Sequence, residues 1–457
     1  MQTYLKPNDS ISIIDNATRT WFYMNEITSI YKCPTPTINN VVVAVVSFGG
    51  GLYGNVDGSG NLTGGDVHTY WSSIGIAVEN HPKVVVKTIG GTTNRPNVND
   101  GGSTIENTID VETIGAACPS SKLTIVLYIA PNSFVSFNTV INAILNDTVY
   151  VPNVISISWG APEIYFGNVL LNSINSLLQT ANNRNINVTV ASGDNGSNDG
   201  VGGKGNYCDF PSSSPCAISC GGTNLKCPNY IYNNTTREIA WSAGGGGISS
   251  YFSKPTYQSS ISGTKRNTPD IALVADPNTG VLYLIGGTQM IIGGTSIVAP
   301  LVAGYLAATN INVLFNPIIY NTNLIGFNDI ASGSNGGYSA KVNYDNCTGL
   351  GSFKGDILAS IINYQLTLNV TSLNISGKNT STIQVTSSSP FNSYIKWTSS
   401  NTNVATVSAT GIVTSLANGT TIVTASGINP YASKKVTVTV IGITPRKNFI
   451  KPGNRRK

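Results

Sequence analysis

Hydrophobic residues over the first two thirds of the chain fall in short continuous runs separated by longer amphipathic segments. Runs rich in Val and Ile predict buried strands at 41–48, 83–88, 123–130, 153–158, 186–191 and 216–220. Helices are predicted between them near 66–79, 103–117, 136–145 and 165–183. Apolar strands that alternate with helices are typical of an α/β fold with a mostly parallel sheet covered on both faces. Catalytic groups in such sheets collect beyond the carboxyl ends of the strands.

The pattern changes after about residue 363. Short alternating runs rich in Val, Thr and Ser, as in "SSNTNVATVSATGIVT" and "KKVTVTV", predict a small all-β sandwich over 365–441. These runs resemble the bacterial immunoglobulin-like module of group 2. Such modules usually act as spacers or adhesive appendages, so the resemblance implies attachment to a surface or a partner.

Charge is sparse and nearly balanced, with 26 basic and 21 acidic residues. Six of the basic residues lie in the last segment, "PRKNFIKPGNRRK", so 442–457 is predicted to be a flexible basic tail. The remainder shows no basic face, and we expect no nucleic-acid partner. No run approaches the roughly 18 apolar residues of a membrane span, and the polar N-terminus has no signal-peptide core. An intracellular or virion-associated location fits this pattern, and secretion by another route stays open.

Seven cysteines, an odd number, favour reduced thiols in a chain without a secretion signal. The four at 208, 216, 220 and 227 are close enough in sequence to suggest a pair. They could also form a zinc site, but they lack the paired CxxC spacing of such sites.

The stretch "MIIGGTSIVAPLVAG" places Ser296 after a sharp glycine turn and before a predicted buried helix over 297–308. Free backbone N–H groups at a helix N-terminus can stabilise an oxyanion, so this serine is a candidate nucleophile. A simple helix N-cap is the alternative.

A nucleophilic serine needs a base. The two histidines, His68 and His81, do not lie in a turn of the kind that supplies a base, and we interpret them as structural. Glu106 and Asp110 in "ENTIDVE" are four residues apart, which places both carboxyls on one helix face. Two acids this close repel when both are ionised, so one retains a proton, and the pair can relay a proton to a serine. Glu112, two positions on, is expected to be exposed.

A third candidate is Asp194 in "VTVASGDNGSND", at the carboxyl end of a buried strand. Only a protonated aspartate could donate to an oxyanion there. In isolation, a turn-forming aspartate is the simpler interpretation.

Taken together, these segments resemble the sedolisins, the serine-carboxyl peptidases. The matching segments occur in family order over about 36–362: "ENTIDVE", "VISISWGAPE", "ASGDNG", "DFPSSSPCAISCGGTNL", "AWSAGGGGISSYFSKPTYQ", "RNTPDIALVADPNTG" and "GGTSIVAP". The resemblance implies a subtilisin-like, doubly wound α/β fold and peptide-bond hydrolysis in acid.

The resemblance also implies roles for individual residues. Ser296 corresponds to the nucleophile, Glu106 to the base, Asp110 to the residue that orients this base, and Asp194 to the oxyanion donor. Trp159 falls where the family packs a tryptophan near the carboxylates, although a role as core filler is equally consistent.

The family carries one calcium ion late in the domain. By resemblance, its ligands here are the side chains of Asp329 and Asp345 and the carbonyls of Ile330, Lys341 and Asn343. Lys341 and Asn343 stand where the family commonly has glycine, and a glycine-only backbone conformation there would be strained.

Two departures concern regulation. Sedolisins generally have a long N-terminal prosegment, whereas residues 1–35 are expected to be only a short extension. Ser47 is expected to replace a further acid that some members carry on the first strand. The predicted function is a serine-carboxyl endopeptidase acting on proteins or peptides at acid pH. A tripeptidyl-type aminopeptidase and an inactive adhesive protein that uses only its Ig-like module are the alternatives.

Overall fold

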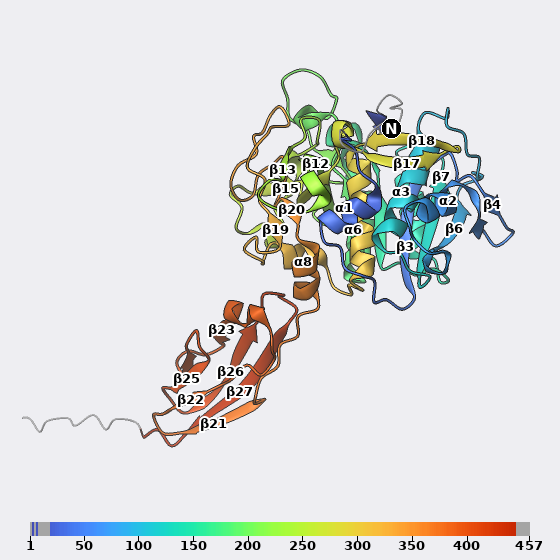
Figure 1. Cartoon of the computed structure of the whole chain (residues 1–457). Coiled ribbons are helices and arrows are strands. Elements are labelled where there is room, and N and C mark those ends of the chain that lie inside the picture. The colour runs from blue at the N-terminus through green and yellow to red at the C-terminus, as the bar shows by residue number, and fades with distance from the viewer. Residues whose placement is uncertain (1, 4–5, 8–18, 445–457) are drawn as a thin grey trace, which may run out of the picture. The chain divides into compact units, whose positions relative to one another are not determined.

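The structure is a computed structural model that describes residues 2–3, 6–7 and 19–444. The chain divides into two compact units between Ile362 and Asn363 (Figure 1). Most of the predicted basic tail, from residue 445 on, lies outside the described residues.

A mostly parallel sheet forms the centre of the first unit, as the sequence predicts. Within the described residues it has eight strands, in the order β13-β12-β10-β8-β3-β7-β6 with β16 also beside β12. Their bounds are β3 (Val41–Phe48), β6 (Lys83–Thr88), β7 (Leu123–Ala130), β8 (Val154–Ile157), β10 (Asn187–Ala191), β12 (Ile218–Lys226), β13 (Arg237–Ala240) and β16 (Ile271–Val274). All neighbours run parallel except β12 and β13. The strand order reverses at β3, which is where doubly wound sheets open a crevice for ligands.

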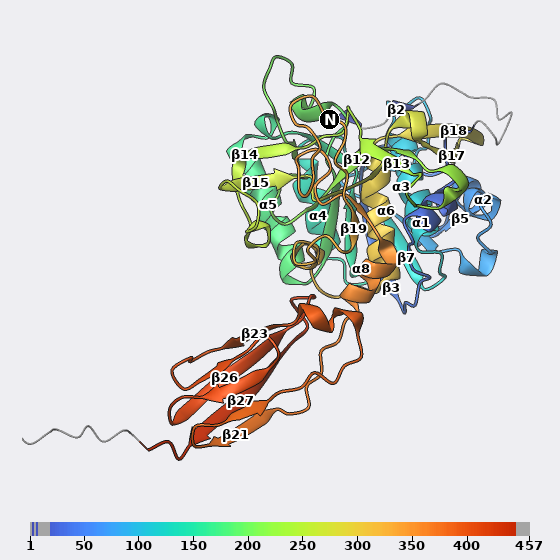
Figure 2. The same ribbon diagram turned by 60° about the vertical axis from the view of Figure 1, so that its left-hand side comes forward.

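Helices cover both faces of this sheet. The helices of the first unit are α1 (Met24–Ile30), α2 (Gly65–Ser73), α3 (Ser103–Ala117), α4 (Ser136–Leu145), α5 (Gly167–Asn183), α6 (Thr295–Ala308), α7 (Phe315–Ile319) and α8 (Gly355–Ile362). Helices α3 and α6 pack together on one face, and α4 and α5 pack on the other (Figure 2). Helix α5 buries only the stripe at 171, 174, 178 and 181, whereas every residue of α6 is buried. A helix without a solvated face belongs to the core.

Short strands pair around the rim of the central sheet. Antiparallel pairs join β4 (Asn55–Val56) with β5 (Leu62–Thr63), β14 (Gly247–Ser253) with β15 (Lys265–Thr268), and β19 (Phe327–Asn328) with β20 (Ser352–Phe353). The hairpin of β17 (Val281–Ile285) and β18 (Thr288–Gly293) also pairs with β2 (Lys6–Pro7). Strand β9 (Trp159–Pro162) lies between β1 (Gln2–Thr3) and β11 (Asp209–Phe210).

The second unit has two sheets around its own apolar core. One sheet contains β21 (Ser372–Ser376), β27 (Ser433–Ile441), β26 (Gly419–Ser426) and β23 (Lys396–Ser399). The other contains β22 (Thr380–Thr382), β25 (Ile412–Ser415) and β24 (Ala405–Val407). Alternate residues, such as Val436, Val438 and Val440 of β27, point into the core. This alternation is the predicted all-β pattern.

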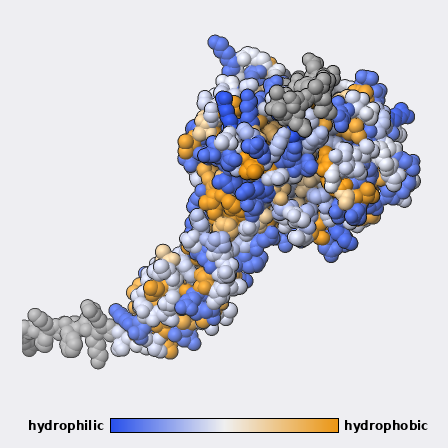
Figure 3. Space-filling model, viewed as in Figure 1, coloured by the Kyte–Doolittle hydropathy of each residue, from blue (hydrophilic) through white to orange (hydrophobic). Residues whose placement is uncertain are grey.

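On the face shown in Figure 3, hydrophobic residues lie in separate groups among hydrophilic ones. Among the described residues, none of the helices combines the length and the apolar character that crossing a bilayer requires.

Candidate active site

A glycine turn delivers Ser296 to the start of α6. Strand β18 ends at Gly293 and α6 begins at Thr295, so Gly294 makes the turn with a φ of 131°. A Cβ on Gly293 would lie 2.4 Å from the backbone nitrogen of Pro277. Both positions therefore require glycine, one for its φ and one for the close approach. The helix begins two residues before the predicted 297, which makes Ser296 its second residue, and this serine is buried.

Helix α3 presents the two predicted carboxylates to Ser296. Glu106 and Asp110 lie one turn apart, and both are 0% exposed. Burial raises the pKa of Glu106 well above its ordinary value, and the charges of Asp110 and Asp194 raise it further. The nearby Ser296 hydroxyl lowers the pKa of Glu106. Neither this hydroxyl nor the Glu106 carboxyl makes a hydrogen bond shorter than 3.5 Å. The structure thus brings this serine and the carboxylate pair together.

Asp110 is buried as deeply as its partner. Burial raises the pKa of its carboxyl, and a hydrogen bond from the Ser158 hydroxyl lowers it. Two raised pKa values in one buried pair mean that the pair does not hold two negative charges at acid pH.

The expectation that Glu112 is exposed is wrong. Its side chain is 0% exposed, and its Oε2 accepts a hydrogen bond of 3.3 Å from the backbone N–H of Leu284. Burial raises the pKa of this carboxyl well above its ordinary value. Helix α3 packs against α1, α2, α6 and β17, so it has no solvated face for an acid.

Asp194 follows β10 and lies directly beside the residue before the nucleophile. It is 2% exposed, and its Oδ1 accepts hydrogen bonds of 2.8 Å from both the backbone N–H and the hydroxyl of Thr295. The N–H of Gly193 donates to the same threonine hydroxyl over 3.1 Å. Gly245 packs directly against this loop, and its N–H donates to the Gly193 carbonyl over 2.6 Å. A Cβ on Gly245 would lie 1.8 Å from the Ser192 carbonyl oxygen, so the close approach requires glycine.

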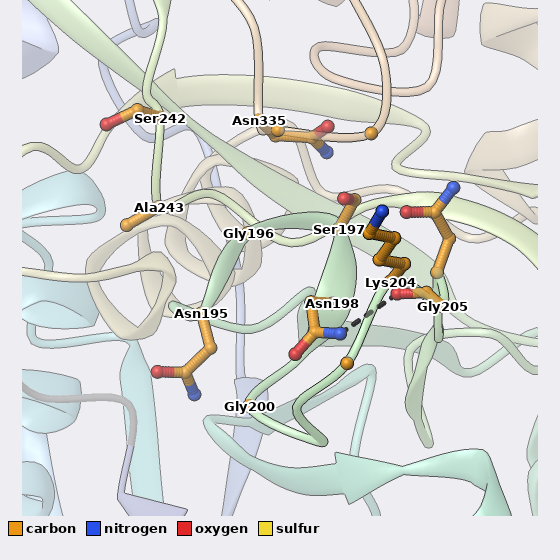
Figure 4. A pocket seen from close by; sticks show the side chains of 14 residues that line it. Asn195, Gly196, Ser197, Asn198, Gly200, Lys204, Gly205, Ser242, Ala243 and Asn335 are labelled. Atoms are coloured by element: carbon orange, nitrogen blue, oxygen red, sulfur yellow. Dashed lines mark hydrogen bonds between the residues drawn. The ribbon is translucent and has the colours of Figure 1, made fainter.

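The loop after Asp194 contains an acid that sequence reasoning missed. Asp199 is 2% exposed, neither of its carboxyl oxygens has a hydrogen-bond partner, and burial followed by the charge of Asp194 raises its pKa. An aspartate in a loop rich in Gly and Asn has no periodic signal that could have revealed its burial. A polar pocket of about 760 Å³ adjoins this loop, between Asn195, Asn198, Lys204 and Asn335 (Figure 4).

The histidines lie apart from this cluster, as expected for structural residues. Nδ1 of His68 contacts the carbonyl of Gly64 within α2 and its preceding turn. The two histidine rings lie 5.8 Å apart, and each packs edge-on against Trp71.

Trp159 is the first residue of β9, and Ser47 lies next to the last residue of β3. Trp159 is fully buried and packs edge-on against Phe48 at 5.5 Å, within the main core cluster. The Ser47 hydroxyl hydrogen-bonds the side chain of Asn107 on α3. The Ser47 side chain is therefore held by an amide of α3.

The predicted calcium residues converge on one loop. The backbone N–H of Asn343 donates to Asp329 over 3.0 Å, and that of Lys341 donates to Asp345 over 3.1 Å. The Ile330 carbonyl accepts from the hydroxyl of Thr348, which also contacts Asp345. Asn343 adopts a left-handed φ of 65°, which asparagine tolerates better than most residues. The replacement of glycine at this position is therefore accommodated.

All seven cysteines carry free thiols, so the suggested pair among 208, 216, 220 and 227 is not formed. Over the described part of the chain, no cluster of three or more His, Cys, Asp or Glu side chains is placed to hold a metal ion, and the zinc alternative is not formed either.

Comparison with known proteins gives two separate matches. Residues 363–442 match the family of bacterial Ig-like domains, group 2. The chain is 34% identical to kumamolisin of Bacillus sp. (strain MN-32), over 62% of this chain and 54% of that protein. It is 30% identical to sedolisin of Pseudomonas sp. (strain 101), over 72% of this chain and 59% of that protein. The chain thus spans between half and three fifths of the length of these two relatives.

A solved structure agrees with the sequence matches. Pseudomonas sedolisin, described as a serine-carboxyl proteinase complexed with two molecules of pseudo-iodotyrostatin, superposes with a TM-score of 0.64 at 27% identity. The match covers 75% of this chain and 98% of the solved one, so it takes in nearly the whole sedolisin fold. The chain therefore belongs to the sedolisin family and carries a C-terminal bacterial Ig-like domain.

Proposed function

We propose that the peptidase domain, predicted at 36–362, is a serine-carboxyl endopeptidase that hydrolyses peptide bonds of proteins or peptides at acid pH. The observation that supports this most strongly is a cluster formed by three parts of the fold. Helix α6 contributes Ser296, α3 contributes Glu106 and Asp110, and the loop after β10 contributes Asp194. Family membership supports the same activity, since a serine-carboxyl proteinase shares this fold.

The geometry supports a mechanism without histidine. Ser296 Oγ attacks the carbonyl carbon of the substrate while its proton passes to Glu106. The carbonyl oxygen then carries the negative charge, which a protonated Asp194 stabilises. Glu106 returns the proton to the leaving amine, and a water molecule hydrolyses the acyl-serine by the reverse sequence.

The expected pH profile follows from the protonation states. The carboxylate pair must carry one negative charge to accept the serine proton, whereas Asp194 must stay protonated to donate. Burial raises the pKa values of Glu106 and Asp110. The acid limb of the profile, where activity appears as the pH rises, therefore lies at a pH above the pKa of an ordinary carboxyl. Deprotonation of Asp194 ends activity at higher pH, which gives a bell-shaped profile on the acid side of neutrality.

Digestion of a peptide library at several pH values, read by mass spectrometry, tests this proposal. Wild type should cleave internal bonds in acid, and Ser296→Ala should cleave none while keeping the melting temperature. Release of N-terminal tripeptides alone would favour the aminopeptidase alternative. If Ser296→Ala cleaves as well as wild type, or if wild type cleaves nothing at any pH, the peptidase proposal fails.

We also propose that the loop at 329–345 holds one calcium ion. The ligands expected from the resemblance are all oxygen atoms, two carboxylates and three backbone carbonyls, which suit a hard cation. Two contacts support the proposal, because the N–H groups of Lys341 and Asn343 join this segment to Asp345 and Asp329. Asp345 is 3% exposed, and burial raises the pKa of its carboxyl, so a bound cation would offset the cost of its charge. Calcium would tie the two carboxylates together and stabilise the loop.

Thermal melting with and without a chelator tests calcium directly. A ligand that binds only the native state raises the melting temperature by mass action. Chelation should lower the melting temperature, added Ca²⁺ should restore it, and Asp345→Asn should remove the response. An unchanged melting curve, with no calcium by elemental analysis, would contradict this part of the proposal.

For the Ig-like domain we propose a role in attachment to a surface or partner. The match over residues 363–442 and a core of its own support an appendage that folds separately from the peptidase domain.

A further inference from the structure

Ser158, to which sequence reasoning assigned no role, lies where the central strand β8 passes into β9. Its side chain is 0% exposed, and β8 lies between β3 and β10 in the middle of the sheet. The hydroxyl therefore lies at the end of a central, fully buried strand.

The Ser158 hydroxyl contacts both halves of the catalytic cluster. It donates a hydrogen bond of 2.6 Å to Oδ1 of Asp110, and it lies 3.4 Å from the backbone carbonyl of Ser296. The other carboxyl oxygen of Asp110 is buried and has no hydrogen-bond partner. Within the described residues, Ser158 therefore makes the hydrogen bond that holds the Asp110 side chain.

The contact with the nucleophile has a cause in the helix. In an α-helix, a carbonyl accepts the N–H of the residue four positions later, and Pro300 has no N–H to donate to Ser296. The carbonyl of Ser296 is thus available to Ser158. The hydroxyl has only one proton, and the shorter distance assigns it to Asp110.

The groups around the carboxylate pair offer little other stabilisation of a negative charge, so the hydrogen bond from Ser158 matters. Asp194 faces Glu106 from the loop after β10, and Tyr283 of β17 faces both carboxylates of the pair. Tyr283 itself donates to or accepts from Thr113 over 2.8 Å and also interacts with Glu112. These neighbours are acids or phenols, and none of them is a cation that could stabilise an ionised carboxylate.

We propose, on the basis of the proposed peptidase function, that Ser158 is a positioning residue that keeps the negative charge of the pair on Asp110. Glu106 then holds the shared proton before the reaction. When Ser296 attacks, its O–H bond breaks and an O–H bond forms on Glu106, while the proton already on Glu106 moves to Asp110. The electron pair left on Ser296 Oγ forms the new bond to the substrate carbonyl carbon. Both carboxyls end neutral, and the negative charge has moved to the oxyanion.

This role predicts a shift in the pH profile. A hydrogen bond to the ionised form lowers the pKa of a carboxyl, and Ser158 makes such a bond to Asp110. Without it, the pair loses its first proton at higher pH. A hydrogen bond to a charged group corresponds to a shift of about one pH unit or more. At pH values below the acid limb, kcat of Ser158→Ala should therefore be about tenfold lower than that of wild type. KM should change little, because Ser158 acts through Asp110.

The experiment compares kcat and KM across the acid range for wild type, Ser158→Ala and Ser158→Thr. Ser156→Ala is the matched control, because Ser156 is a buried serine of β8, two residues earlier, whose hydroxyl has no hydrogen-bond partner. Ser158→Ala should move the acid limb of kcat to higher pH, while Ser158→Thr, which keeps the hydroxyl, and Ser156→Ala should keep the wild-type limb.

An unshifted limb in Ser158→Ala, or a loss of rate that is uniform across pH and accompanied by a lower melting temperature, would overturn the inference. Ser296→Ala measured in parallel separates the two proposals. If Ser296→Ala is inactive and Ser158→Ala is unshifted, only the role of Ser158 fails. If Ser296→Ala is as active as wild type, the peptidase mechanism itself fails.

Discussion

Replacement of Asp194 tests the least usual part of the mechanism, a carboxyl that donates to the oxyanion. In Asp194→Asn, the amide oxygen can still accept the two 2.8 Å hydrogen bonds from Thr295, and the NH₂ group can donate without titrating. Asp194→Ala removes both the acceptor and the oxyanion donor. The two variants therefore separate the structural role of the side chain from its chemical role.

The structure sets the expected magnitudes. Loss of one oxyanion donor costs about 10²–10³ in kcat, which is about 2.7–4 kcal/mol, and we expect this loss for Asp194→Ala. The alanine variant also leaves the N–H and hydroxyl of Thr295, which is fully buried, without this acceptor. Each unsatisfied group costs roughly 1–3 kcal/mol, so its free energy of unfolding should fall as well. Asp194→Asn should lose less kcat and less free energy of unfolding than Asp194→Ala.

The assay is kcat/KM against pH for both variants, with urea unfolding of each at one acid pH. Because asparagine does not deprotonate, the alkaline limb of the bell should weaken or move to higher pH in Asp194→Asn. If Asp194→Asn is as inactive as Asp194→Ala although it is folded, or if its alkaline limb matches that of wild type, Asp194 is not the protonated donor. Activity that peaks above neutral pH and is abolished by His68→Ala would refute the carboxylate mechanism altogether.

Three further outcomes are expected. Glu112→Gln should leave the stability of the fold nearly unchanged in acid and should increase it near neutral pH. The reason is that burial raises the pKa of Glu112 in the folded state. Such a carboxyl stabilises the fold below its unfolded pKa, and that stability is lost as the pH rises through the folded pKa. Melting temperature against pH measures this, and parallel curves for variant and wild type would contradict it. Asp270→Asn should lower the free energy of unfolding by about 3–5 kcal/mol, because Arg266 is fully buried and pairs with Asp270 over 2.6 Å. Urea unfolding measures the loss, and a change below about 1 kcal/mol would show that the pair is not needed. A chain that ends at Ile362 should hydrolyse peptides as the full chain does, because the catalytic cluster lies in the first compact unit. A folded but inactive truncation, by circular dichroism and peptide assay, would show that the Ig-like domain contributes to catalysis.

Local patterns were enough for those features that depend on neighbours in the sequence. The runs of Val and Ile predicted the parallel strands, and the alternation after residue 363 predicted a separate β domain. The four-residue spacing of Glu106 and Asp110 placed both on one face of α3, and the double glycine predicted the turn before Ser296. Periodicity and turn chemistry act over a few residues, so one chain segment contains all the information they need.

Features that depend on distant segments could not be predicted this way. Helical periodicity says which residues share a face, but the elements packed around the helix decide which faces are buried, and for Glu112 these are α2 and β17. Likewise, nothing near Ser158 in the sequence indicates Asp110, 48 residues earlier, as its partner. The fold joins them because β8 ends beneath α3, at the edge of the sheet where the catalytic groups meet. The sequence by itself determined which groups could perform the chemistry, and the tertiary structure decided which of them are desolvated and in contact, because burial and hydrogen bonding depend on segments far apart in the chain.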